Sequence, residues 1–201
     1  MRASTVEKKK RIIEVATELF IEHGYKDTSL DQIVSMCGGS KQTLYRYFGN
    51  KEGLLTEVMA YHTSVSLEEA FKLSDSQHLN VAEALEGFGL KYIKGLCADP
   101  LLSLFRIVAA DFHKNQSVTE SFWQRGPQRI HGYLIEYLQS DAVQQQLSIT
   151  NPQLACAQLL ALIKLDYQTT AMLGHELPDD NELKIAITQA VAAFISLYKK
   201  V

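Results

Sequence analysis

The fold is decided by residues 28–51, which read TSLDQIVSMCGGSKQTLYRYFGNK. A Ser or Thr stands before each of two short apolar-periodic runs, and the glycine pair Gly38-Gly39 separates the runs. Because Ser and Thr cap helix N-termini and glycine ends helices, this pattern predicts two short helices joined by a tight turn. We interpret the stretch as a helix-turn-helix.

The second of these helices is expected to begin after the cap Ser40 and to present its polar side chains outward. Leu44 and Phe48 stand four residues apart and must point inward, which leaves their neighbours exposed. Long donors and aromatic rings crowd into this segment: Lys41, Gln42, Thr43, Tyr45, Arg46 and Tyr47. Such side chains suit phosphates and base edges, so the sequence predicts a DNA-binding head.

A first helix precedes this pair and is expected to end at Gly24, a left-handed C-cap. Its apolar residues recur at i, i+4, i+7 and i+8 and form one stripe: Ile12, Ala16, Leu19 and Phe20. Thr28 and Ser29 both stand where the N-cap of the next helix belongs, with Asp31 or Gln32 placed to complete a capping box. The head should therefore contain three helices.

Longer helical patterns occupy the remainder of the chain. One helix should start at Lys51 and run toward Lys72, before a polar break at residues 73–80. Further helices are expected at 81–98, 100–114, 119–138, 152–174 and 179–199. Strand alternation is absent, so the sequence predicts an all-α protein. We expect a helix-turn-helix head at residues 1–51, joined by the long helix to a helical ligand-binding and dimerisation bundle at residues 52–201.

The charge of the chain is divided unevenly. The 201 residues are 46% apolar and 21% charged, with a net charge of −3, as in a folded protein. Residues 1–51 contain nine Lys and Arg against six Asp and Glu, whereas the remainder contains eleven against seventeen. A polyanion would be attracted to the head and repelled by the bundle.

The sequence gives no sign of a membrane or secretory protein. No apolar run approaches the roughly 20 residues of a membrane span, and the basic N-terminus leads into an amphipathic pattern, not into a signal peptide. We expect a cytoplasmic protein, in which Cys37, Cys97 and Cys156 are small buried hydrophobes with no paired spacing.

The segments RIIEVATELFIEHGY, residues 11–25, and TSLDQIVSMCGGSKQTLYRYFGNKEGLL, residues 28–55, resemble the DNA-binding domain of the TetR/AcrR family of transcriptional regulators. The motifs that carry the resemblance are the LF-x-x-x-GY pair, the Thr-Ser helix cap and TLYRYF-x-x-KE-x-LL. The C-terminal half resembles the family's ligand-binding domains only in its helix count and in a weaker pattern that begins with LFRIVAAD.

The resemblance implies a set of DNA contacts. Phosphate contacts would come from Thr28, Ser40, Thr43, Tyr45, Tyr47 and Lys51. Lys41 and Gln42 would reach base edges, with Arg46 serving either purpose. Gln can pair bidentately with adenine and Lys can donate to guanine, each worth about 1–3 kcal/mol of discrimination.

Two residues depart from the family pattern. Gly39 occupies a turn position where the family usually has a valine, and Gln42 replaces a frequent glycine. The first departure costs a core contact, so Gly39→Val is expected to raise thermal stability. The second should alter operator preference.

The basic run at residues 8–11 has two possible interpretations. It is either a solvated disordered arm or a segment that lies against phosphates or the minor groove.

We expect a small-molecule pocket in the bundle. The candidates are polar and aromatic residues on otherwise apolar helices: Tyr61, His62, Tyr92, Arg106, His113, Trp123 and Tyr133. An apolar cavity needs only a few oriented polar groups, and neighbouring aromatic rings supply surface for a lipophilic ligand. The alternative is that these side chains are ordinary core or surface residues.

The last two predicted helices carry broad faces of small and aliphatic residues. These faces consist of Leu154, Gln158, Leu162, Leu165, Thr169 and Met172, together with Ile185, Thr188, Ala192, Ile195 and Leu197. They suit a four-helix interface in a homodimer, as the family implies, unless they cover the subunit's own core. Two heads spaced by about 34 Å would read both halves of a palindrome.

The resemblance implies a ligand-responsive DNA-binding transcriptional regulator. We expect a repressor that binds a palindromic operator as a homodimer and is released by a small lipophilic effector, without cofactor or metal. A regulator with no small-molecule ligand is one alternative. An all-α enzyme or metal protein that uses His62, His113 or His131 is another, although HExxH, paired CxxC, GxSxG and phosphate-loop motifs are all absent.

Overall fold

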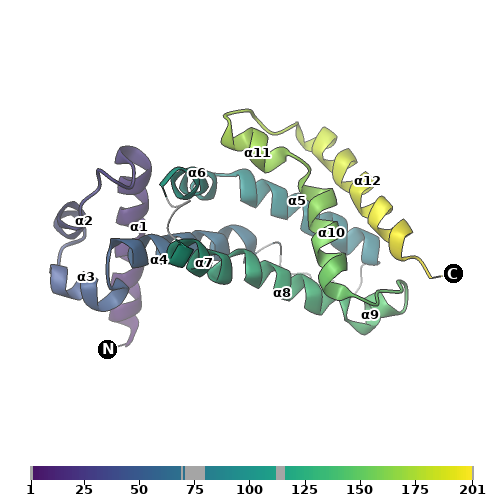
Figure 1. The fold of residues 1–201 in the computed structure, drawn as a ribbon, viewed down its shortest axis with the longest axis horizontal. Helices are drawn as coiled ribbons and strands as arrows, with labels where there is room; N and C mark the ends of the chain where they lie inside the picture. The colour runs from purple at the N-terminus through teal and green to yellow at the C-terminus, as the bar shows by residue number, and fades with distance from the viewer. Residues whose placement is uncertain (1, 69, 71–79, 112–115, 201) are drawn as a thin grey trace. The chain divides into compact units, whose positions relative to one another are not determined.

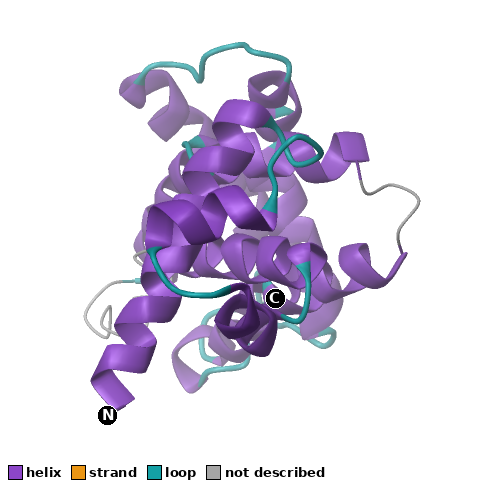
Figure 2. Ribbon diagram, turned by 90° about the vertical axis from the view of Figure 1, so that its left-hand side faces the viewer, coloured by secondary structure: helices purple, strands orange, loops and turns teal. Residues whose placement is uncertain are grey.

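The computed structural model describes residues 2–68, 70, 80–111 and 116–200. Those residues form α-helices linked by loops, with no strand among them beyond one isolated bridge between Leu147 and Lys199 (Figures 1 and 2). The prediction of an all-α protein is therefore confirmed. None of the described helices combines the length and apolar content that a membrane crossing requires.

Two compact units divide the chain. The first unit comprises Met1–Ser64 and Asp99–Gly126, and the second comprises Val65–Ala98 and Pro127–Val201. The helices of the first unit are α1 (Arg2–His23), α2 (Leu30–Cys37), α3 (Lys41–Phe48), most of α4 (Lys51–Glu68), α6 (Leu101–Asp111) and α7 (Gln116–Arg125). The helices of the second unit are α5 (Val81–Cys97), α8 (Pro127–Leu138), α9 (Asp141–Gln144), α10 (Pro152–Lys164), α11 (Tyr167–Met172) and α12 (Asp180–Tyr198). Contacts thus group α1–α3 with most of α4 and with α6 and α7. The domain boundary expected at residue 51 stays a prediction.

The head is held together by the predicted apolar stripe of α1. Phe20 is fully buried with Ile33 of α2 and Leu44 of α3 in one cluster. The local signals act as predicted at the helix ends. The Ser29 hydroxyl accepts from the Gln32 amide nitrogen at 3.2 Å, and the Gln32 side chain accepts from the Ser29 amide nitrogen at 2.7 Å, so Gln32 completes the capping box.

The second unit is built on the close approach of three helices. A Cβ on Gly89 of α5 would lie 2.8 Å from Ile187 of α12 and 3.3 Å from Ile163 of α10, so only glycine fits between them. The surrounding core includes Leu159 and Phe194, both fully buried.

Two predicted helices are each divided in the structure. The helix expected at 152–174 breaks between α10 and α11 at Leu165, whose φ of 44° and ψ of −129° leave the helical region. The helix expected at 119–138 divides at Gly126, because the following proline disfavours helical geometry in the residue before it. The short helix α9 was not predicted. The expected extension of α4 to Lys72 and the polar break after it lie outside the described residues, apart from Ala70 and Asn80.

The prediction for Gly39 is wrong. Gly39 has a φ of 119°, which side-chain-bearing residues rarely adopt, whatever core contact a valine could make. We expect Gly39→Val to lower the free energy of unfolding by about 1–3 kcal/mol, measured by urea denaturation. Gly132→Ala is the control, since Gly132 lies inside α8 with open space around it and should gain about 0.5–1 kcal/mol. A stabilised Gly39→Val variant would contradict the assigned turn geometry.

Two buried threonines offer a matched test of hydrogen bonding in the first unit. Thr17 and Thr63 are both 6% exposed. The Thr17 hydroxyl is paired with the Ile13 carbonyl and His62, whereas the Thr63 hydroxyl has no hydrogen-bond partner among the described residues. Removing an unpaired buried hydroxyl relieves a desolvation cost, while removing a paired one leaves its partners unsatisfied.

We therefore expect Thr63→Val to raise the free energy of unfolding by about 1 kcal/mol and Thr17→Val to lower it by about 1–3 kcal/mol. Urea denaturation of the two variants beside the unmodified protein measures both changes. Equal destabilisation by the two substitutions would show that the Thr63 hydroxyl is paired in solution.

Candidate nucleic-acid interface

Helix α3 presents the polar face that its sequence predicts. Leu44 and Phe48 are 1% and 7% exposed and face the core, and Ser40 caps the helix by accepting from the Thr43 amide nitrogen at 3.3 Å. The residues Lys41, Gln42, Tyr45 and Arg46 are exposed. The N-terminal end of a helix attracts anions, so the first turn of α3 favours an approaching phosphate.

Lys41 is held by a carboxylate of the neighbouring helix. Its amine lies 2.7 Å from the Asp31 side chain in the first turn of α2, and both side chains are exposed. The hydrogen bond to Asp31 raises the pKa of Lys41, which keeps the amine charged. To reach a base edge, Lys41 has to exchange or share this carboxylate.

Tyr47 lies at the edge of α3 and contacts two cations. The Arg46 guanidinium carbon is 5.1 Å from the centroid of the Tyr47 ring, and the Lys9 amine is 5.6 Å from it. The ring also meets Phe48 edge-on with centroids 6.1 Å apart. Tyr47 is half-buried, so its ring packs in the head while positive charge gathers around it.

Thr28 does not lie where the predicted phosphate contact needs it. Its side chain is 1% exposed, and its hydroxyl lies 3.0 Å from the Leu19 carbonyl and 2.8 Å from the Gly24 carbonyl. Those carbonyls belong to the C-terminal part of α1 and to Gly24, the residue that follows the helix. Thr28 therefore closes the end of α1, and Ser29 alone caps α2.

Lys51 binds the loop that follows α1. Its amine donates to the Lys26 carbonyl at 3.1 Å and lies 4.4 Å from the centroid of the Tyr25 ring. These contacts hold the Lys51 amine at the loop after α1, and its phosphate contact stays a prediction. The same bond fastens the start of α4 to the head.

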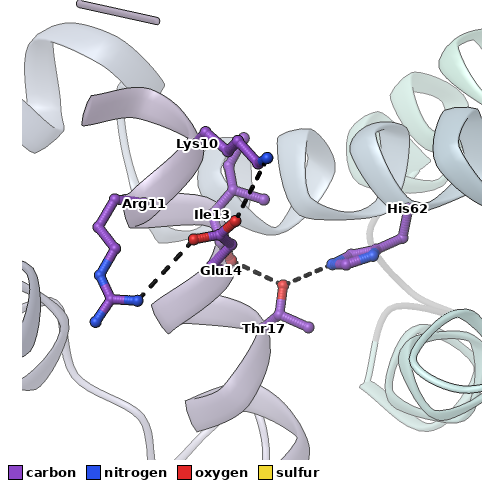
Figure 3. Close-up of polar contacts among 6 residues, drawn as sticks. All are labelled: Lys10, Arg11, Ile13, Glu14, Thr17 and His62. Atoms are coloured by element: carbon purple, nitrogen blue, oxygen red, sulfur yellow. Dashed lines mark hydrogen bonds and ion pairs between the residues drawn. The ribbon is translucent and has the colours of Figure 1, made fainter. Parts of the chain in front are cut away.

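A second polar contact joins α1 to α4 farther along. The Thr17 hydroxyl donates its one hydrogen to the Ile13 carbonyl at 2.7 Å, so its oxygen accepts from Nε2 of His62 at 2.9 Å (Figure 3). Burial lowers the pKa of His62 and so favours the neutral ring. The bond to Thr17 requires only that Nε2 carries a hydrogen.

The predicted ligand-binding residues are distributed over both units. The first unit contains Tyr61, His62, Arg106 and Trp123, the second contains Tyr92 and Tyr133, and His113 lies outside the described residues. Tyr92 is a core residue: it stacks on Phe88 with ring centroids 5.5 Å apart, and burial raises its pKa to about 12. Arg106, Trp123 and Tyr133 are exposed. A hollow at the start of α5 and the end of α12 is lined by none of the predicted ligand-binding residues.

Thr63 is a candidate for ligand binding that sequence reasoning missed. Its buried, unpaired hydroxyl lies beside the Phe122–Gly126 turn of α7, where a Cβ on Gly126 would stand 3.4 Å from it. Phe105 and Phe122 of the same unit meet edge-on, with ring centroids 5.3 Å apart. A threonine on an amphipathic helix carries no sequence signal for an unpaired hydroxyl.

The described residues contain no group of three or more His, Cys, Asp or Glu side chains that could hold a metal ion. All three cysteines are free thiols. Burial raises the pKa of each, to about 11 for Cys156, which keeps these thiols protonated and weakly nucleophilic.

Two family models match the chain. Residues 12–58 match the model described as bacterial regulatory proteins, tetR family, and residues 83–200 match the one described as AefR-like transcriptional repressor, C-terminal domain. Among curated proteins, the HTH-type regulator YhgD of Bacillus subtilis is 34% identical over 84 residues, 40% of this chain and 44% of the relative. The regulator QacR of Staphylococcus aureus is 43% identical over 51 residues, 25% of this chain and 27% of the relative. The matched segments thus span less than half of these curated relatives.

Solved structures resemble the chain over nearly its whole length. A TetR-family transcriptional regulator from Mesorhizobium loti has a TM-score of 0.85 at 25% identity and covers 98% of both chains. The flavonoid-responsive regulator FrrA has a TM-score of 0.79 at 25% identity, over 96% of this chain and 97% of that one. This fold is that of transcriptional regulators and not of enzymes. With a helix-turn-helix at residues 12–58 and a regulator's C-terminal domain at 83–200, this chain belongs to the TetR family of DNA-binding transcriptional regulators.

Proposed function

We propose that this protein is a repressor that binds a palindromic operator as a homodimer and is released from it by a small lipophilic effector. The observation that carries the proposal is the exposed face of α3, where Lys41, Gln42, Tyr45 and Arg46 stand together on a helix whose other side is fixed in the core. A face of this chemistry fits the major groove.

Sequence readout would come from the first turn of α3. Gln42 is exposed and can pair bidentately with adenine, and Lys41 can donate to guanine. Asp31 would increase the base specificity of Lys41. The amine has to exchange or share an ion pair of 2.7 Å when it binds DNA, so binding is favourable only where the base offers strong acceptors. The Asp31 carboxylate also repels phosphates that approach out of register.

The faces predicted to pair two subunits support the homodimer. None of the eleven residues named for this interface is buried in the subunit, and the exposed fractions reach 51% for Leu154, 50% for Ile185 and 65% for Leu197. Exposed aliphatic side chains on these helices are what a subunit interface would cover, which supports the proposal. A second subunit would cover them and supply the second head that a palindrome requires.

Effector control would act through α4. This helix is bound to the head by Lys51 at its start and by His62 eleven residues later, so a shift of α4 has to move α1 or break these bonds. The Phe105–Phe122 pair and the unpaired Thr63 hydroxyl support an aromatic effector with an acceptor group, and the relative FrrA is by its name flavonoid-responsive. The effector must favour the DNA-free state by a few kcal/mol, and an effector that left operator affinity unchanged would contradict this coupling.

Gln42→Ala tests the readout. We expect operators selected from random DNA to lose their preference at one base pair per half-site, a change of about 1–3 kcal/mol in discrimination. Lys51→Ala is the comparison: it should weaken binding to every sequence and flatten the salt dependence, with the consensus unchanged. An unchanged consensus for Gln42→Ala would contradict its contact with a base.

The double variant Ile185→Glu/Leu197→Glu tests the dimer. Burying carboxylates in place of two aliphatic side chains should raise the dimer dissociation constant at least about 100-fold, measured by analytical ultracentrifugation. Gln128→Glu, which adds a carboxylate at an exposed position of α8, serves as the control and should leave the constant unchanged. If the double variant dimerises as tightly as the unmodified protein, the interface lies elsewhere.

A further inference from the structure

The basic run at residues 8–11 is helical. Helix α1 begins at Arg2, so Lys8, Lys9, Lys10 and Arg11 occupy one full turn of an ordered helix and do not form an extended arm. A helix is about 10–12 Å across, whereas the minor groove is about 6 Å wide. These four residues therefore do not enter the minor groove as an arm would.

The turn divides into two pairs of cations with different surroundings. Lys10 and Arg11 are directed to Glu14 on their own helix, with nitrogen-to-oxygen distances of 3.9 and 4.0 Å (Figure 3). Their charge is partly compensated by this carboxylate. Phosphate would have to compete with Glu14 for them.

Lys8 and Lys9 lie against the helix-turn-helix instead. The Lys9 amine stands 5.6 Å from the centroid of the Tyr47 ring and 5.9 Å from that of Phe48. The Lys8 amine lies at the turn, 3.4 Å from the position that a Cβ on Gly39 would occupy. Among the described residues, no carboxylate lies within ion-pair distance of either amine.

The two amines follow one edge of α3. Thr43 and Tyr47 are four residues apart and half-exposed, so they form the edge of α3 between its outward and inward faces. Lys8 shares a small crevice with Thr43 near the start of α3, and Lys9 covers Tyr47 near its end. Helix α3 has eight residues and is therefore about 12 Å long. The amines of Lys8 and Lys9 lie beside its two ends.

We propose that Lys8 and Lys9 form a second phosphate-binding element of the head. When the outward face of α3 enters the major groove, this turn of α1 lies along the sugar-phosphate backbone that borders the groove, and each amine binds a backbone phosphate. The inference rests on the binding of DNA by α3. An ammonium group is a point charge without base preference, so this element contributes affinity and register but no sequence readout.

The chain supplies a matched control. Lys8→Ala/Lys9→Ala and Lys10→Ala/Arg11→Ala each remove two positive charges from adjacent positions of the same helical turn. Binding to a selected operator and to a scrambled duplex is measured by fluorescence anisotropy at several salt concentrations. Because each phosphate contact contributes about 0.9 to the slope of log K against log salt, loss of Lys8 and Lys9 should reduce the slope by about 1.8 per bound half-site.

The same variant should weaken binding to the operator and the scrambled duplex by equal factors. Lys10→Ala/Arg11→Ala should change the slope by less than half as much. The conservative variant Lys9→Arg, which keeps both the charge and the ring contact, should retain the slope of the unmodified protein.

Three outcomes would overturn the proposal. An unchanged slope for Lys8→Ala/Lys9→Ala, with or without a lowered melting temperature, would give these lysines a structural role in the head only. Equal slope losses in the two double variants would indicate that the turn acts through its total positive charge and not through phosphate contacts of Lys8 and Lys9. A loss confined to the operator would indicate base contact. If the unmodified protein bound neither duplex, the proposal that α3 binds DNA would be wrong. That result differs from the three above, in which the unmodified protein binds DNA.

Discussion

The burial of one apolar face of α3 against α1 and α2 is the constraint on which the DNA-binding surface depends. Phe20, Ile33 and Leu44 are essentially inaccessible to solvent and lie in one cluster, so rotation of α3 about its axis would expose Leu44. With that rotation fixed, Lys41, Gln42, Tyr45 and Arg46 face away from the core. Burial of the apolar face of α3 in the core therefore orients its polar face outward.

Polar contacts then attach α4 to this head at two levels. Lys51 binds the backbone after α1, and His62 donates to Thr17 inside α1. Both bonds depend on α1 staying where the core places it. These two contacts join α4 to the head within the first compact unit.

Local signals in the sequence predicted the head well, because caps and turns depend on residues within one helical turn. Ser29 with Gln32, Ser40 and Gly24 act as their residue types indicate. Contacts across the fold were not predictable in the same way. The ion pair between Asp31 and Lys41 joins two helices, and the burial of Thr28 depends on where α1 ends. No glycine or proline at Leu165 indicates the helix break there. Pocket residues depend on side-chain packing, which hydrophobic periodicity does not specify.

The central claim is that a homodimer places two copies of α3 on one face of a DNA duplex. Hydroxyl-radical footprinting of the unmodified protein on a selected operator tests it most directly. The account predicts two protected patches related by two-fold symmetry, with centres about one helical turn, 34 Å, apart. A single protected patch, or two patches without symmetry, would contradict it.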